Sequence, residues 1–319
     1  MSHDKSEHPN HPTLVLFCFA VVYLVWGSTF YAIRLGIQSF PPHLLAGFRY
    51  LFAGAVVYPV LRATTKETPT WPQWRTTLIA GALLFCIGNG TVSWSELRVP
   101  SGIAALLVAT VSLWMVLVDW LRPGGVRPPP RVIAGFFLGF AGMALLVGPK
   151  HLGNSERIDP IGAFALIAAS LAWAIGSIYL RHHPLPRSPL LGAGMQMLCG
   201  GLLLCFTSLA IGETRHFHFA DVTLRSWIAL LYLTAFGTGL GFSAYAYILR
   251  HSTASRVATY AFVNPVVALF LGWLLAAEPL TLRTALASGI ILTAVLLVIT
   301  APHKTQIEAE ESIPVPGEA

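Results

Sequence analysis

An arginine lies inside an apolar stretch of this sequence, where a permanent positive charge has no water to solvate it. Arg49 stands in the run "AGFRYLFAG", about seven residues after the turn Pro41-Pro42. An arginine at the centre of a membrane helix costs about 2.5–3.5 kcal/mol, so it normally faces a cavity or a partner. In a cavity its guanidinium suits a carboxylate, which it binds through two parallel hydrogen bonds. The alternative is a side chain that extends to the lipid headgroups.

A second polar residue, Gln196, occupies the matching place in the other half of the chain. A shift of 147 residues pairs several further positions: Trp26 with Trp173, Pro42 with Pro189 and Gly54 with Gly201. Farther along the shift grows to 153 and pairs Ser112 with Pro265 and Trp120 with Trp273. Polar groups at matched depths suit a shared polar lumen, so we expect Arg49 and Gln196 to face one.

Other side chains of suitable type are candidates to line this lumen. Aromatic rings stack on flat substrates and attract cations, while amides and hydroxyls offer hydrogen bonds. The candidates are Trp26, Ser28, Asn89, Trp94, Trp114, Trp173, Tyr245, Tyr260 and Asn264. For each aromatic ring the alternative is an interfacial belt or helix packing.

Two residues are expected to act as hinges, namely Gly27 and Pro265. A proline in the middle of a helix frees a carbonyl about one turn earlier, which we place at Tyr260. Broken helices of this kind expose polar backbone groups at transporter sites, although a plain kink is the alternative.

Acidic residues are almost absent from the apolar runs. Glu96 and Asp119 fall near the ends of runs, where water reaches them. We expect Glu96 to pair with Arg98 at the surface rather than to carry protons, so no buried titratable group for proton coupling is predicted.

The composition shows what must position these residues. The chain of 319 residues is 55% hydrophobic and 11% charged, with a mean hydropathy of +0.67. Soluble domains are nearer one quarter charged, so the composition indicates a multi-pass membrane protein. The net charge of +6 comes from basic residues scattered singly through short loops, which favours a role in topology over binding to nucleic acid. The four cysteines lie in apolar runs and are expected to pack there without forming disulfides.

About 20 apolar residues cross a bilayer as a helix. The sequence contains ten such runs: 13–33, 43–62, 75–95, 101–121, 131–148, 160–180, 190–210, 226–248, 254–276 and 282–301. Twelve Lys and Arg residues fall on the side of the N-terminus and seven on the other, which predicts that both termini are cytoplasmic.

Five spans in each half is an odd number, so the second half must enter the membrane inverted relative to the first. The expected fold is therefore all-α, with ten transmembrane helices as two inverted five-helix repeats, an architecture of secondary transporters. The expected organisation is a cytoplasmic N-terminal arm (1–12), a first repeat (13–148), a linker (149–159), a second repeat (160–301) and a disordered cytoplasmic tail (302–319).

Three stretches resemble a known family. These are "WGSTF" with "FRYLFAG", then "VPSGIAALLVATVSLW", and finally "STASRVATYAFVNPVVALFLGWLLAAEPLT". Together they resemble the EamA-type proteins of the drug/metabolite transporter superfamily over roughly residues 13–301. The resemblance implies export of small metabolites or toxic compounds across the bacterial inner membrane. This sequence departs from the family's pattern at one place. The family often carries a Gly-Glu pair after the fourth helix, whereas this chain reads "PGGV" (123–126) there, so Glu278 in the second half has no acidic counterpart in the first.

Two other classes of protein were weighed against a transporter. An intramembrane serine protease needs a histidine beside its serine, and the ninth and tenth runs, which follow "GFSA" (241–244), contain none. A membrane scaffold stays open as an alternative. The histidine pairs at 182–183 and 216–218 fall on opposite membrane faces, so no metal site is predicted. A Walker A loop and other cofactor motifs are also absent. The expected partners are a small-molecule substrate and the bilayer. A spacing such as Gly135–Gly139 does not by itself indicate a dimer, so the oligomeric state stays open.

Overall fold

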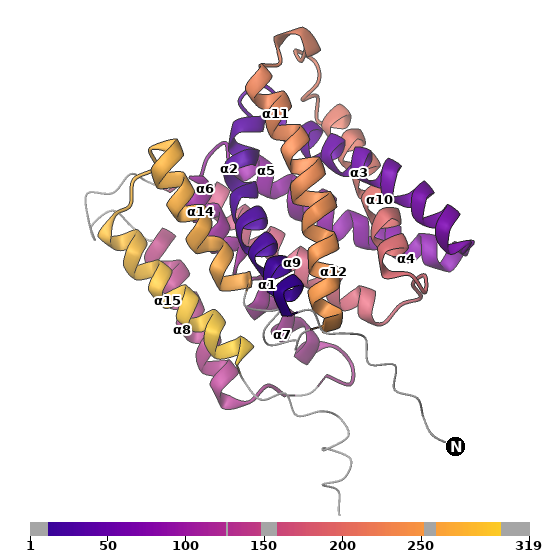
Figure 1. Ribbon diagram of the computed structural model, residues 1–319. Coiled ribbons are helices and arrows are strands. Elements are labelled where there is room, and N and C mark those ends of the chain that lie inside the picture. Colours follow the sequence, from indigo (N-terminus) through magenta and orange to yellow (C-terminus); the bar gives the residue numbers. More distant parts are fainter. Residues whose placement is uncertain (1–11, 126, 148–157, 252–259, 301–319) are drawn as a thin grey trace, which may run out of the picture.

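The computed structural model describes residues 12–125, 127–147, 158–251 and 260–300, and this part of the chain consists of helices and their connections (Figure 1). The predicted all-α class is therefore confirmed. The predicted cytoplasmic tail and most of the N-terminal arm and of the linker lie outside the described residues.

The helices follow the predicted runs closely. In the first half they are α1 (Pro12–Val21), η1 (Val22–Trp26), α2 (Gly27–Gly36), α3 (Pro42–Thr65), α4 (Trp71–Gly81), η2 (Ala82–Gly90), α5 (Thr91–Ser95), α6 (Ser101–Val108), α7 (Val111–Leu121) and α8 (Pro130–Val147). In the second half they are α9 (Pro160–Arg181), α10 (Pro189–Ala210), η4 (Phe219–Asp221), α11 (Leu224–Tyr232), η5 (Leu233–Leu240), α12 (Gly241–His251), α14 (Tyr260–Ala276) and α15 (Leu282–Ile299).

Among the described residues, seven continuous helical segments are long and apolar enough to cross a membrane. They are Thr13–Gly36, Pro42–Thr65, Trp71–Ser95, Ser101–Leu121, Pro160–Arg181, Pro189–Ala210 and Leu224–Tyr245. Three shorter apolar helices, Pro130–Leu145, Val263–Ala276 and Leu282–Val298, coincide with the other predicted runs. The chain is thus an integral membrane protein, and the remaining three spans of the predicted ten stay a prediction.

Proline and side-chain caps fix where several helices begin. Pro160 and Pro189 each occupy the first turn of a helix. Backbone N–H groups in that turn have no acceptor within the helix, so a proline, which lacks the N–H, costs no hydrogen bond there. Asp159 precedes α9 and accepts a hydrogen bond from the Ile161 backbone nitrogen, and Ser188 does the same for Leu191 ahead of α10. These caps satisfy amide donors that a helix leaves free at its start.

Three of the spans contain π-helical segments, which the sequence did not predict. They are η1, η2 and η5. Segment η2 lies in the third span of the first half, and η5 lies in the third span of the second half. A π-helix is rare and occurs frequently at functional sites. The predicted run 101–121 is also interrupted, because α6 ends and α7 begins around Ala109–Thr110.

Helices α3 and α10 cross in close contact, and we call this contact the seam. A Cβ added to a glycine here would come within 3.1 Å of the facing helix in four residue pairs: Gly47 with Cys205, Gly54 with Leu198, Gly194 with Tyr58 and Gly201 with Leu51. Residue numbers rise along α3 as they fall along α10, so the two helices are antiparallel. A shift of 147 residues exchanges the first pair with the third and the second pair with the fourth.

Two other helices that the sequence places in equivalent positions also meet. Gly135 of α8 packs against Val298 of α15, while Gly142 packs against Ile291. This contact is antiparallel as well, and α8 and α15 lie side by side at one edge of the molecule (Figure 1).

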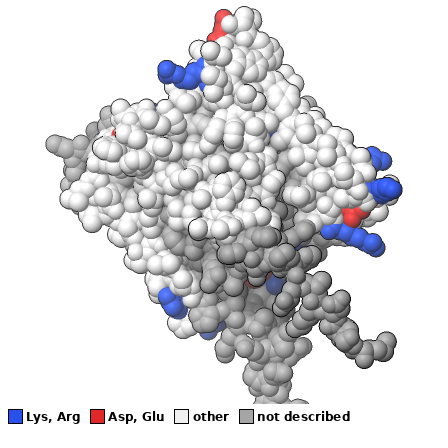
Figure 2. Space-filling model, viewed as in Figure 1, with Lys and Arg blue, Asp and Glu red and all other residues white. Residues whose placement is uncertain are grey.

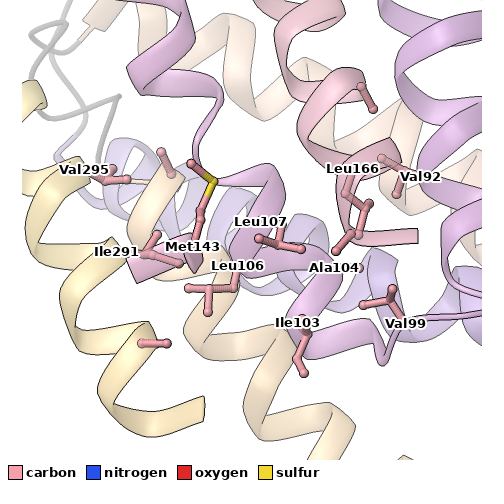
Figure 3. Close-up of a cluster of buried hydrophobic side chains, with 14 residues drawn as sticks. Val92, Val99, Ile103, Ala104, Leu106, Leu107, Met143, Leu166, Ile291 and Val295 are labelled. Atoms are coloured by element: carbon pink, nitrogen blue, oxygen red, sulfur yellow. The ribbon is translucent and has the colours of Figure 1, made fainter. Parts of the chain in front are cut away.

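Helix α6 is surrounded by other helices. Leu106 and Leu107 are fully buried, with Leu166 of α9 on one side and Ile291 and Val295 of α15 on the other (Figure 3). The apolar character of this helix on all sides fits such a position.

The outer faces of the bundle are apolar instead of charged. Figure 2 shows a broad face without charged side chains, with Lys, Arg, Asp and Glu gathered towards its edges. Large side chains more than half exposed include Phe17, Phe137, Phe164, Phe206 and Leu282. Exposed apolar surface of this extent fits contact with lipid, where a helix satisfies its backbone groups within its own segment.

Candidate functional site

Arg49 lies on α3 with 6% of its surface exposed and contacts the π-helical segment η5. Its Nε donates a hydrogen bond of 3.0 Å to the Thr238 hydroxyl, which in turn donates to the Leu233 carbonyl. The guanidinium also lies 5.0 Å from the centre of the Tyr50 ring. Within the described part of the chain, no carboxylate forms an ion pair with Arg49. A buried guanidinium with unused donors is equipped to bind an anion.

An aromatic cluster adjoins this contact. Trp26, the last residue of η1, donates from its indole nitrogen to the Gly237 carbonyl at 3.0 Å, one residue before the partner of Arg49. Its ring centre lies 5.2 Å from that of Tyr245 and 5.3 Å from that of Tyr260. The structure therefore brings Trp26, Tyr245 and Tyr260 together beside Arg49.

The two predicted hinges lie close to each other. A Cβ at Gly27 would lie 2.6 Å from the Val267 side chain and 3.1 Å from the Asn264 carbonyl, so α2 and α14 touch beside Pro265. The carbonyl that Pro265 frees belongs to Ala261, four residues earlier. The prediction that it belongs to Tyr260 is therefore wrong. Asn264 is 8% exposed, and its side-chain oxygen has no hydrogen-bond donor among the described residues.

Ser28 lies next to this region and shares a hydrogen bond of 2.6 Å with the Tyr232 hydroxyl. The remaining candidates make other contacts. Trp94 stacks on Arg98, Trp114 packs against Phe140, Trp173 packs against Phe85, and Asn89 donates to Leu84 within η2.

Gln196 does not meet Arg49. Its backbone carbonyl lies against Gly81, where α4 passes into η2, whereas Arg49 lies against Gly237 and Thr238 of η5. Each of the two polar residues thus contacts the third span of the opposite half.

A second polar cluster lies where α2, α5, α6 and α14 end or begin. The expected surface pair of Glu96 with Arg98 is wrong. Arg98 instead binds Asp159 at 3.0 Å, ahead of α9, and Glu96 turns inward with 1% of its surface exposed. Neither carboxylate oxygen of Glu96 has a hydrogen-bond donor among the described residues. Burial, reinforced by the charge of Glu278 and opposed by that of Arg34, raises the pKa of Glu96 well above its ordinary value.

Glu278 is the centre of this cluster, although the sequence offered it no counterpart. Its carboxylate accepts hydrogen bonds from the Ser101 nitrogen and hydroxyl, at 2.7 and 2.8 Å, and from the Gly102 nitrogen at 3.0 Å. Arg34 adds an ion pair at 3.5 Å. Glu278 thus caps α6 from across the bundle. The signal in the sequence was the helix start "VPSG", whose free amide donors require an acceptor.

Arg34 connects this cluster to the surface. Its Nη1 donates to the Glu96 backbone carbonyl at 3.2 Å, and the side chain is 37% exposed. A pocket of about 380 Å³ opens beside it, lined by Tyr31, Arg34, Leu35, Gln38, Arg225, Leu275, Ala276 and Ala277. This pocket lies at the ends of the helices and is separate from the surroundings of Arg49.

His43 and Glu213 form a third polar contact, between the start of α3 and the turn after α10. The His43 ring nitrogen Nδ1 lies 2.7 Å from Glu213 Oε1, and the Ser208 hydroxyl donates to Oε2 at 2.8 Å. Burial opposes ionisation of Glu213, but the bonds from His43 and Ser208 outweigh it and lower the pKa of this carboxyl.

Comparison with known proteins adds to this geometry. The model of the EamA-like transporter family matches residues 13–148 and again residues 160–300. The chain belongs to the EamA-like transporter family. Its resemblance to that family, inferred from three stretches of sequence, is therefore confirmed, and the chain is a membrane transporter by family.

Individual relatives agree with this EamA assignment. The uncharacterized inner membrane transporter YedA of Escherichia coli (strain K12) is 36% identical over 278 residues, which cover 87% of this chain and 88% of YedA. A probable amino-acid metabolite efflux pump of Salmonella typhimurium is 26% identical, with 83% and 88% covered. A crystal structure that is 19% identical matches with a TM-score of 0.59 over 94% of this chain and 99% of the other, and so shares its fold.

Proposed function

We propose that this protein is a secondary-active exporter of small metabolites in the bacterial inner membrane, and that Arg49 binds a carboxylate of its substrate. The observation that carries this proposal is the burial of Arg49 beside η5 without an acidic partner among the described residues. A bidentate carboxylate would use the guanidinium donors that Thr238 leaves free. The Salmonella relative is named a probable amino-acid metabolite efflux pump, which supports substrates that carry a carboxylate.

Neighbouring groups would complete the substrate site. Trp26, Tyr245 and Tyr260 offer ring faces within one cluster. The Asn264 side-chain oxygen, which has no donor among the described residues, offers a hydrogen-bond acceptor near the two hinges. A substrate with both a carboxylate and an apolar or aromatic part would use all of these groups.

The proposed mechanism is alternating access between two inverted halves, residues 13–148 and 160–301. The seam supports it, because its contacts come in pairs that the 147-residue shift exchanges. An isologous, antiparallel contact of this kind is expected where a pseudo-two-fold axis lies in the membrane plane. Rocking of the halves about the seam would expose Arg49 to each side in turn. In this proposal both termini are cytoplasmic.

The experiment is an export screen in bacterial cells with and without the protein. The panel contains amino acids, aromatic carboxylates, sugars that lack a carboxylate, and toxic cations. We expect resistance to, and lower cellular accumulation of, some carboxylate compounds and no effect on the sugars. A protein present in the membrane with no effect on any compound would contradict the exporter and favour a scaffold.

A further inference from the structure

A buried acidic cluster at the ends of α5 and α14 has no role in the substrate site proposed above. Glu96 and Glu278 are 1% and 8% exposed, and Arg34 is the cation that contacts them directly within the described part of the chain. Glu278 has four donors around it, whereas the Glu96 carboxylate has none among the described residues.

The charge balance of this cluster requires one more positive charge. Two carboxylates and one guanidinium leave a net charge of −1 in a buried place, which is costly. Among the described residues, the other charged groups near this cluster do not supply the missing charge. Arg98 is neutralised by Asp159 at 3.0 Å, and Arg225 lies exposed on the pocket beside Arg34.

We propose that Glu96, Glu278 and Arg34 form a one-proton site, with the proton on Glu96. A proton fits better than a metal ion because Glu278 is already fully engaged and the guanidinium repels a second cation. The proton would come from water in the pocket of about 380 Å³ that Arg34 lines, and it would form an O–H bond on a Glu96 oxygen. Its release would return it to water and leave Glu96 negative.

Loss of this proton would change the contact between the halves. Arg34 already bonds to the Glu96 backbone, so a negative Glu96 side chain would compete with Glu278 for the same guanidinium. Glu278 belongs to the connection between α14 and α15, and it holds the start of α6 through Ser101 and Gly102. A weaker Arg34–Glu278 pair would loosen α2 from the connection after α14, and in this way proton loading would be coupled to movement. This last step rests on the proposed transport function, whereas the proton site itself does not.

The direct test is an infrared pH titration of the full-length protein in lipid vesicles, which follows the C=O band of protonated carboxyl groups. We expect a band that titrates well above the value of about 4.3 of an ordinary glutamate. Glu96→Gln should remove it. Glu67→Gln, a matched change in the connection between α3 and α4, should leave it in place. A band that persists in Glu96→Gln, or a midpoint near the ordinary value, would overturn the proposal.

Two further infrared measurements test the role of Arg34 and distinguish a proton from a metal cation. Arg34→Gln should move the midpoint upward, because the nearby positive charge is lost, and an unchanged midpoint would count against the cluster. Replacing choline chloride with sodium chloride at fixed pH should not alter the band, whereas loss of the band in sodium would show a metal-cation site instead. None of these measurements depends on transport. A failed export screen would therefore leave the proton site intact, and normal export without the titrating band would reject only the proton site.

Discussion

Gly54 of α3 approaches Leu198 of α10 so closely that a Cβ at position 54 would lie 2.7 Å from the Leu198 backbone nitrogen. Because the obstacle is backbone, a methyl group there must separate the two helices. We expect Gly54→Ala to lower the stability of the protein by about 1–3 kcal/mol, as overpacking does. Thermal unfolding in detergent measures this. Gly289→Ala in α15, where nothing lies within 4 Å, is the control, and an equal loss in both variants would contradict a tight seam.

Removal of the buried guanidinium tests the substrate site. Hydrogen bonds to charged groups contribute about 1.5–3 kcal/mol, so Arg49→Ala should weaken binding of a carboxylate substrate by about 10- to 100-fold. Export of the compound found in the screen should fall accordingly, while the amount of protein in the membrane stays the same. Export kinetics with immunoblotting of membranes measure both.

A matched control shows whether loss of any guanidinium lowers export or only loss of the buried one. Arg62→Ala removes an exposed guanidinium that contacts only the Tyr58 hydroxyl in the described structure, and export should be unchanged. Normal export by Arg49→Ala would mean that Arg49 has a structural role or none.

Stability should depend on pH through Glu213. Its pKa is lowered in the folded protein, so the folded state binds fewer protons than the unfolded state at mildly acidic pH. The stabilisation is present above the unfolded value of about 4.3 and is lost as the pH falls through the lowered folded value. Melting temperatures measured from pH 7 down to pH 3 should show this loss. Glu213→Gln should reduce it, and an identical pH profile for that variant would contradict the assignment.

Topology is testable without a substrate. Reporter proteins fused to the C-terminus should give a cytoplasmic signal, because the excess of Lys and Arg lies on that side. A reporter fused within the turn between α10 and η4, near Glu213, should give a periplasmic signal. The reverse pattern would invert the proposed membrane orientation.

The sequence predicted the helices well because their signal is local. Length and hydropathy placed the spans, and Pro160 and Pro189 marked two of their starts within one residue. The break of 101–121 near Thr110 was missed, since both pieces are equally apolar and the interruption depends on how α6 packs among its neighbours.

The polar contacts were harder to predict from the sequence, because they join residues that lie far apart in the chain. Arg49 was recognised as exceptional, but its partner Thr238 lies 189 residues away in an unremarkable Gly-Thr-Gly segment. Glu96 and Arg98 looked like a surface pair because they are neighbours in sequence. Arg98 instead turns to Asp159, and nothing in the local pattern distinguishes that choice.

The π-helical segments have a consequence for length changes in the chain. A π turn holds one residue more than an α turn. Deletion of a single residue from η2 or η5 would therefore let the segment close into regular α-helix, with the helix on either side of it keeping its hydrogen bonds. The same deletion in the middle of α3 would rotate everything beyond it by about 100° and turn the seam glycines away from α10. The third span of each half is thus a place where an inserted residue is already accommodated.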